Sequence, residues 1–196
     1  MRVDWDCFAL IALALLVSPP EVTAAVLVAA AMHEGGHAAM LRFFGVPMEG
    51  LRLDAMGAVI VAPGARRLSY GRELAVTMAG IAVNLISAPL LARLAVERSW
   101  EWGYLLAGAH LLLGAYNLLP VPPLDGGRAL YLVTAYFWGP DAGEKISASV
   151  GLTVALLLAM FGASVAFSGG GILFLIAALG PFFELICSRK ACLRCC

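Results

Sequence analysis

Charged residues are scarce in this chain. Asp, Glu, Lys and Arg make up 13% of its 196 residues, whereas an ordinary soluble domain has about 25%. Apolar residues supply 62% of the chain, and the mean hydropathy is +0.90. This composition excludes an ordinary soluble domain and predicts an integral protein of the lipid bilayer.

Basic clusters and long polar stretches are lacking as well. The formal net charge is zero, and no basic run is interleaved with aromatic residues, so we do not expect a nucleic-acid partner. No stretch of the chain is polar and long enough for an appended soluble domain. We therefore expect residues 1–196 to form a single membrane-embedded domain.

Against this apolar background, His33-Glu34-Gly35-Gly36-His37 forms an HExxH motif. On a helix, residues i and i+4 share a face, so His33 and His37 can hold one metal ion together. Glu34 lies about 100° around the helix from His33, beside the ion without binding it. A zinc ion with two imidazoles and a third protein ligand keeps an open position for water, whose proton the glutamate can accept.

HExxH also occurs in soluble helices, where these residues are simply solvated. Here the residues before and after the motif, 22–32 and 38–44, are almost wholly or mostly apolar. Ionisable side chains inside an apolar segment are costly and usually mark a functional site. The surroundings therefore favour a metal site.

Apolar runs predict an all-α polytopic membrane protein with about six transmembrane helices. A signal peptide is an alternative for the first run, but Asp4 and Asp6 disfavour the basic start that such a peptide needs. A short apolar and aromatic stretch, 129–138, is expected to be an interfacial or re-entrant helix. The expected spans are 7–18, 21–44, 73–96, 102–119, 146–167 and 171–187.

The stretch 45–71, after the second span, is more charged and is interrupted by Gly and Pro. It contains alternating Leu51-Arg52-Leu53 and the β-prone run Ala58-Val59-Ile60-Val61. We expect a small membrane-associated β-loop. Either it is an ordinary connection, or one of its edges pairs with an unwound substrate.

Asn84 in the third span and His110 in the fourth are polar residues within apolar helices. Asn84 must find a partner at membrane depth, and an interhelical hydrogen bond is the plain interpretation. The small residues Ala79, Gly80 and Ala82 near it let helices approach closely. His110 is expected either to make an interhelical hydrogen bond or, less simply, to touch substrate or relay a proton.

The fourth span is followed by Asn117-Leu118-Leu119-Pro120-Val121-Pro122-Pro123-Leu124-Asp125-Gly126-Gly127. Its prolines cannot continue a helix, and irregular backbone at membrane depth survives only within protein or beside a wet cavity. Asp125, expected on a tight turn, is a candidate third metal ligand. Asn117 and Pro120 are expected to support this loop.

Basic residues predict the orientation of the chain. With six spans, only Arg93 and Arg98 of the thirteen Lys and Arg residues fall on the side opposite the termini. The positive-inside rule then places both termini in the cytosol. Four of the five cysteines lie in or next to the basic tail, 188–196, where thiols stay reduced. The tail is expected to be a juxtamembrane anchor rather than a disulfide scaffold or a metal site.

The order of HExxH, then Ala79-Gly80 with Asn84, then Asn117 to Asp125-Gly126-Gly127 resembles the site-2 protease family of intramembrane zinc metalloproteases. It looks closest to the six-span, sporulation-type subgroup that includes stage IV sporulation protein FB. The resemblance implies that His33, His37 and Asp125 bind one zinc ion and that Glu34 is the general base. It also implies that Asn84 stabilises the tetrahedral intermediate or positions the peptide. The PDZ and C-terminal regulatory domains of many family members are not expected here.

The resemblance implies hydrolysis of peptide bonds within or near transmembrane segments of membrane-protein substrates. The expected location is a bacterial cytoplasmic membrane, and membrane regulatory proteins are further expected partners. One alternative is a catalytically inactive membrane scaffold, although every expected ligand and the base are present. A metal-ion permease is a weaker alternative, because the sequence shows neither internal repeats nor a continuous polar path.

Overall fold

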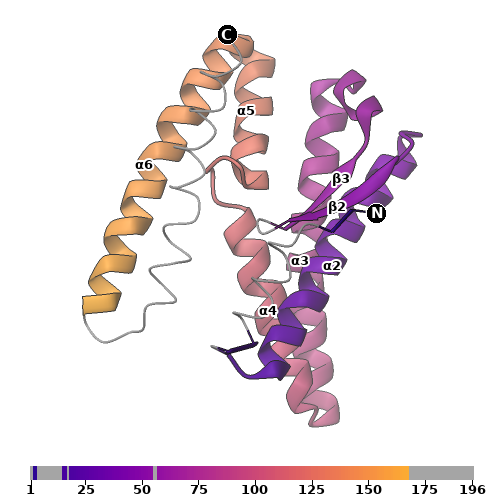
Figure 1. Ribbon diagram of the computed structural model, residues 1–196, viewed down its shortest axis with the longest axis vertical. Coiled ribbons are helices and arrows are strands. Elements are labelled where there is room, and N and C mark those ends of the chain that lie inside the picture. Colours follow the sequence, from indigo (N-terminus) through magenta and orange to yellow (C-terminus); the bar gives the residue numbers. More distant parts are fainter. Residues whose placement is uncertain (1, 4–14, 17, 55–56, 168–196) are drawn as a thin grey trace. The chain divides into compact units, whose positions relative to one another are not determined.

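The computed structural model describes residues 2–3, 15–16, 18–54 and 57–167. The chain divides into two compact units, Met1–Tyr116 and Asn117–Cys196, and each is described by itself. The first holds the strands and the helix with the HExxH motif, and the second holds the proline-rich loop with the helices after it (Figure 1).

Helix α2, Pro20–Phe43, carries the motif. Proline is tolerated in the first turn because the amide there has no helical acceptor, so Pro20 can begin the helix. Glu21 in the first turn and Arg42 in the last complement the helix dipole. The helix ends where Gly45 takes a φ of 70°, a conformation that favours glycine.

Helix α3, Tyr70–Arg98, packs against α2 (Figure 1). A Cβ built on Gly36 would lie 2.8 Å from the Ala79 carbonyl oxygen and 2.9 Å from Val83 Cγ2. Glycine at this position therefore lets the two helices approach closely, as small residues do in membrane helix pairs.

Helix α4, Glu101–Asn117, joins the core of the first unit. Ala25 and Ala29 of α2 are buried with Leu106 and Ala109 of α4, and Leu91 of α3 packs against them. Three helices thus share one apolar core, which brings side chains of α2, α3 and α4 within reach of one another.

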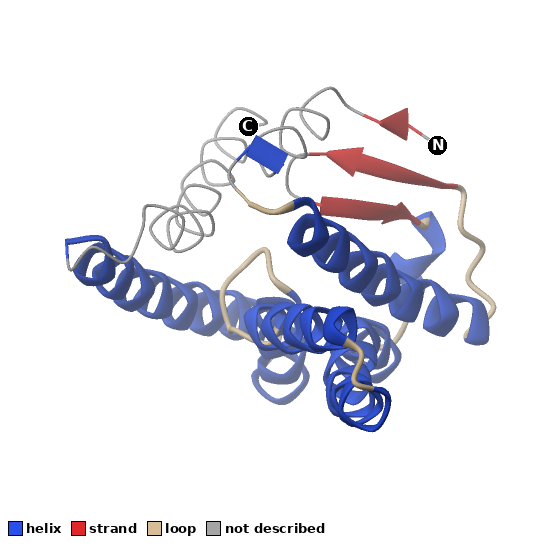
Figure 2. Ribbon diagram, turned by 90° about the horizontal axis from the view of Figure 1, so that it is seen from below, coloured by secondary structure: helices blue, strands red, loops and turns tan. Residues whose placement is uncertain are grey.

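A three-stranded sheet completes the first unit (Figure 2). Strands β2, Gly50–Asp54, and β3, Gly57–Val61, pair antiparallel. Strand β1, Arg2–Val3, pairs parallel with β2, and a short 3₁₀ helix, Pro63–Arg67, leads toward α3. Strands β2 and β3 lie in the stretch 45–71, where the sequence predicts a β-loop, whereas β1 lies outside it.

The second unit contains helices α5, Asp125–Trp138, and α6, Pro140–Phe167, which pack together. A Cβ on Gly143 of α6 would meet the Ala135 backbone of α5 at 2.8 Å. Ser147 also donates a hydrogen bond of 3.2 Å to the Gly127 carbonyl. The hydrogen bond holds the start of α5 against α6, and the close approach of Gly143 packs the end of α5 against the same helix.

Three helices of the described part of the chain are long and apolar enough to cross a membrane: α2, α3, and residues 140–165 of α6. They match the second, third and fifth predicted spans, with boundaries shifted by a few residues. The fourth predicted span is the 17-residue helix α4. The sixth predicted span, and nearly all of the first, lie outside the described residues.

Candidate metal centre

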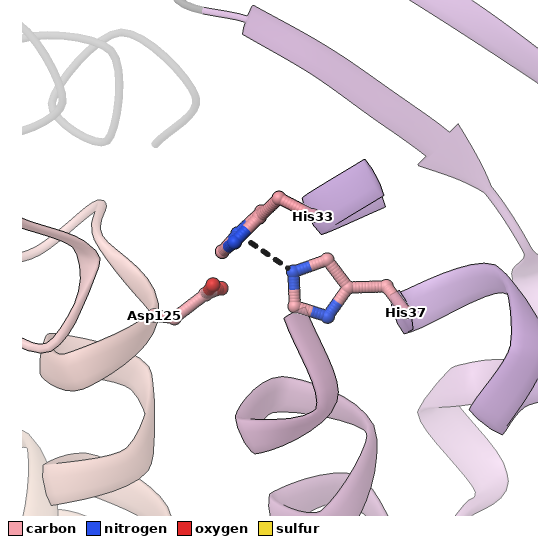
Figure 3. A group of neighbouring side chains, drawn as sticks. All are labelled: His33, His37 and Asp125. Atoms are coloured by element: carbon pink, nitrogen blue, oxygen red, sulfur yellow. Dashed lines mark hydrogen bonds between the residues drawn. The ribbon is translucent and has the colours of Figure 1, made fainter. Parts of the chain in front are cut away.

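His33 and His37 face each other from one side of α2. His33 is buried, with 5% of its surface exposed. The two rings are nearly perpendicular, at 86°, and their Nε2 atoms lie 3.1 Å apart (Figure 3). The i, i+4 spacing of the HExxH motif therefore brings the two imidazole rings into contact on one face of α2.

A backbone carbonyl of α3 orients the His37 ring. The Nδ1–H of His37 donates a hydrogen bond of 2.8 Å to the Val76 carbonyl oxygen. A carbonyl can only accept, so the His37 proton is on Nδ1, and Nε2 is the ring nitrogen that can offer a lone pair to an ion. Metal-binding histidines typically have their other ring nitrogen held in this way.

His33 is held by a side chain rather than by the backbone. Asn84 of α3, fully buried, has its amide nitrogen 3.3 Å from His33 Nδ1. The oxygen of the same amide lies 3.0 Å from Nδ1 of His110 in α4, which is also fully buried. This confirms the interhelical hydrogen bonds expected for Asn84 and His110.

Gly80 of α3 makes room for both imidazoles. A Cβ on Gly80 would lie 2.5 Å from His37 Nε2 and 2.9 Å from His33 Cε1. The small residue predicted to allow close helix packing therefore has a second effect, because it lets the rings lie directly against the α3 backbone.

The distance between the two Nε2 atoms fits a shared metal ion. Two ligands at 2.0–2.1 Å from a tetrahedral zinc ion lie about 3.3 Å apart, and the observed separation is 3.1 Å. Glu34 follows His33 directly on α2, and its side chain is half-buried.

Asp125, Asn117 and Pro120 belong to the second unit. Asp125 is half-buried and is the first residue of α5, so its prediction on a tight turn was wrong: the helix expected at 129–138 begins four residues earlier. The start is fixed by Gly126 and Gly127, where a Cβ would collide with the backbones of Leu118 and Val121.

The loop before α5 carries the other two predicted residues. Asn117 is the last residue of α4, which confirms that the helix ends before the prolines. The Pro120 carbonyl oxygen lies 3.3 Å from a Cβ built on Gly151 of α6. The proline-rich loop is therefore packed tightly against α6.

Residues 90–158 match the model of peptidase family M50. This part of the chain is similar to that family. Over 142 residues, or 69% of the chain, it is 30% identical to a zinc metalloprotease of Methanocaldococcus jannaschii, and it spans 40% of that relative's length. It is 28% identical to stage IV sporulation protein FB of Bacillus subtilis over 152 residues, which are 75% of this chain and 52% of that protein.

A solved structure shares the fold. The site-2 protease from Methanocaldococcus jannaschii superposes with a TM-score of 0.67 and 26% identity, covering 91% of this chain and 83% of that one. The long apolar helices, together with the match to the M50 family, indicate an integral membrane protein.

Sequence reasoning missed two contributors to the histidine pair. The Val76 carbonyl is a backbone group, so no residue pattern can reveal it. Gly36 lies inside the motif, where both middle positions are formally unrestricted. The structure distinguishes them, because a Cβ on Gly35 would have no atom within 4 Å whereas one on Gly36 would meet α3.

Proposed function

We propose that this chain is an intramembrane zinc metalloprotease that hydrolyses peptide bonds within or near the transmembrane segments of other membrane proteins. The observation that carries the proposal is the pair of Nε2 atoms 3.1 Å apart on α2. The M50 match and the relatives named zinc metalloprotease support the same activity.

The proposed zinc ligands are His33, His37 and Asp125. Each offers one ligand atom, and the set of two imidazoles and one carboxylate is typical of catalytic zinc. Asp125 is the only one of the three outside α2, at the start of α5. When bound, zinc supplies a Lewis acid that polarises a carbonyl and acidifies a water molecule.

Glu34 is the proposed general base. Its carboxylate accepts the proton of the attacking water and then passes that proton to the leaving amine. A peptide bond within a helix is shielded, so the substrate must unwind locally before its carbonyl can be attacked.

The remaining predicted residues have supporting roles in the proposal. Asn117 and Pro120 fix the loop that leads to Asp125. For Asn84, stabilisation of the tetrahedral intermediate stays a prediction, and its hydrogen bonds to two histidines support an orienting role.

The proposed arrangement in the membrane has six spans, with both termini in the cytosol of a bacterial cell. In this arrangement the hairpin of β2 and β3 lies at the cytosolic membrane surface, where its edge can pair with an unwound substrate. Membrane regulatory proteins are proposed as further partners, with the substrate as the principal one.

The test is a cleavage assay with a panel of tagged single-span membrane proteins and detergent-purified enzyme. We expect about one zinc per chain, cleavage of at least one panel member, loss of cleavage with a chelator, and recovery on adding zinc. Well-folded protein without zinc would contradict the metal centre. Zinc without cleavage of any panel member would favour a membrane scaffold.

A further inference from the structure

Three polar side chains form a continuous line through the core of the first unit. His33 of α2, Asn84 of α3 and His110 of α4 are joined by contacts of 3.3 Å and 3.0 Å. His33 is 5% exposed, and the other two are fully buried. Three buried polar residues from three helices are costly unless their donors and acceptors match.

In the geometry of the structure, every hydrogen bond in this line points the same way. The Nδ1–H of His110 donates to the Asn84 oxygen, and the Asn84 amide donates to His33 Nδ1. The proton of His33 is then on Nε2, which donates to His37 Nε2 at 3.1 Å. His37 in turn donates from Nδ1 to the Val76 carbonyl.

This arrangement cannot bind a metal ion through His33, because its Nε2 carries a proton. A ligand nitrogen must offer a lone pair, so the His33 proton has to be on Nδ1. Nδ1–H then needs an acceptor from Asn84. A 180° flip of the Asn84 amide provides this acceptor, because the flip exchanges the positions of the oxygen and the nitrogen without altering the shape of the side chain.

The flip changes the partner of His110 as well. The Asn84 nitrogen now faces His110 Nδ1, which must accept, so the His110 proton is on Nε2. Each ring keeps a single proton, and no charge is gained or lost. His37 is unchanged, since the Val76 carbonyl holds its proton on Nδ1 in both states.

The free end of the line is the Nε2 atom of His110. Among the described residues it is one of two buried side-chain polar atoms without a hydrogen-bond partner, the other being Thr23 Oγ1. His110 also lines a recess of about 220 Å³ whose other walls are apolar apart from Ser87. Its tautomer is therefore set by Asn84 alone among the described side chains.

We propose that His110 is a positioning residue for the metal centre: acting through Asn84, it orients His33, and its tautomer changes when the ion binds. This inference rests on the ligand role proposed for His33. His110 would thus act on the metal centre although it lies on α4, two helices after the motif in the sequence.

The first experiment observes the tautomers directly, by nitrogen-15 NMR of histidine-labelled protein in detergent with and without zinc. We expect the protonated nitrogen of His110 to change from Nδ1 to Nε2 on zinc addition, while that of His37 stays at Nδ1. His110 keeping one tautomer in both states would overturn the proposal.

The second experiment measures zinc affinity by competition with a chelator. We expect His110→Phe, which keeps the bulk and removes Nδ1, to weaken zinc binding about tenfold. His110→Asn places a polar group near the Nδ1 position and should restore most of the loss. Thr23→Val is the matched control, because it removes a buried polar atom outside the line, and it should bind zinc as the unaltered protein does.

A failure of this inference differs from a failure of the proposed zinc site. If His33→Ala keeps full zinc affinity, the ligand assignment is wrong. If His33→Ala loses zinc while His110→Phe binds it like the unaltered protein, the site stands and the role of His110 is wrong.

Discussion

At the scale of single residues, the proposed metal centre depends on the absence of a side chain at Gly80 as well as on the two imidazoles. Gly80 has no Cβ, and that space is taken by the imidazoles of His33 and His37. The rings are then fixed from two directions, by the Val76 carbonyl and by Asn84. Orientation of a ligand by such outer partners commonly changes metal affinity 10–100-fold.

Replacing Gly80 by Ala should therefore disrupt zinc binding. The added methyl would meet His37 Nε2 at 2.5 Å, so the ring must leave its position, and we expect at least about a tenfold loss of zinc affinity. Isothermal titration with zinc measures it. Gly35→Ala is the matched control within the motif, since its Cβ meets nothing within 4 Å, and equal losses in the two variants would refute the steric account.

At the scale of elements, prolines and glycines determine where the helices that carry the site residues begin and end. Pro20 begins α2, and the prolines after Asn117 end α4. The first two residues after Asp125 are glycines that lie against loop backbone. Helix α5 can therefore begin at Asp125, which gives the carboxylate a defined place at a helix start.

Gly126→Ala should shift the start of α5. Its Cβ would collide with the Leu118 carbonyl and lie 2.5 Å from the Leu119 carbonyl oxygen, and backbone cannot move as a flexible side chain does. We expect a destabilisation of roughly 1–3 kcal/mol together with weaker zinc binding. Denaturant unfolding in detergent measures the first effect, with Gly71→Ala as an open-space control. Unchanged stability and zinc affinity would show that the loop adapts.

The sequence predicts helices better than it predicts side-chain partners, for a physical reason. Apolar length predicts α2 and α3 closely, and Pro20 also marks the start of α2, because both signals act locally. The start of α5 was missed because it depends on packing of Gly126 and Gly127 against the loop. Asn84 was expected to find a partner, but its choice of two histidines depends on how three helices pack.

At the scale of the whole molecule, the distribution of basic residues predicts the orientation of the chain in the membrane. Arg93 and Arg98 are the only basic residues on one side of the proposed six-span arrangement. They lie near the end of α3, and Ser99 follows it with a φ of 48° before α4 begins. The turn between α3 and α4 is therefore expected outside the cytosol.

Cysteine labelling tests this orientation. In a variant whose native cysteines are replaced by serine, Ser99→Cys should react with a membrane-impermeant thiol reagent in intact cells. Ser69→Cys, at the other end of α3, should react only after permeabilisation. The opposite pattern would reverse the orientation, and reaction of both in intact cells would show that α3 does not cross the membrane.

The measurement that tests the central claim most directly compares the unaltered protein with Glu34→Gln for zinc content and for cleavage of the tagged single-span panel. Gln keeps the size of the side chain and cannot accept the water proton, so we expect equal zinc, about one per chain, and cleavage slower by about 10²–10⁴-fold. Normal cleavage by Glu34→Gln, with zinc present in both proteins, would contradict the account.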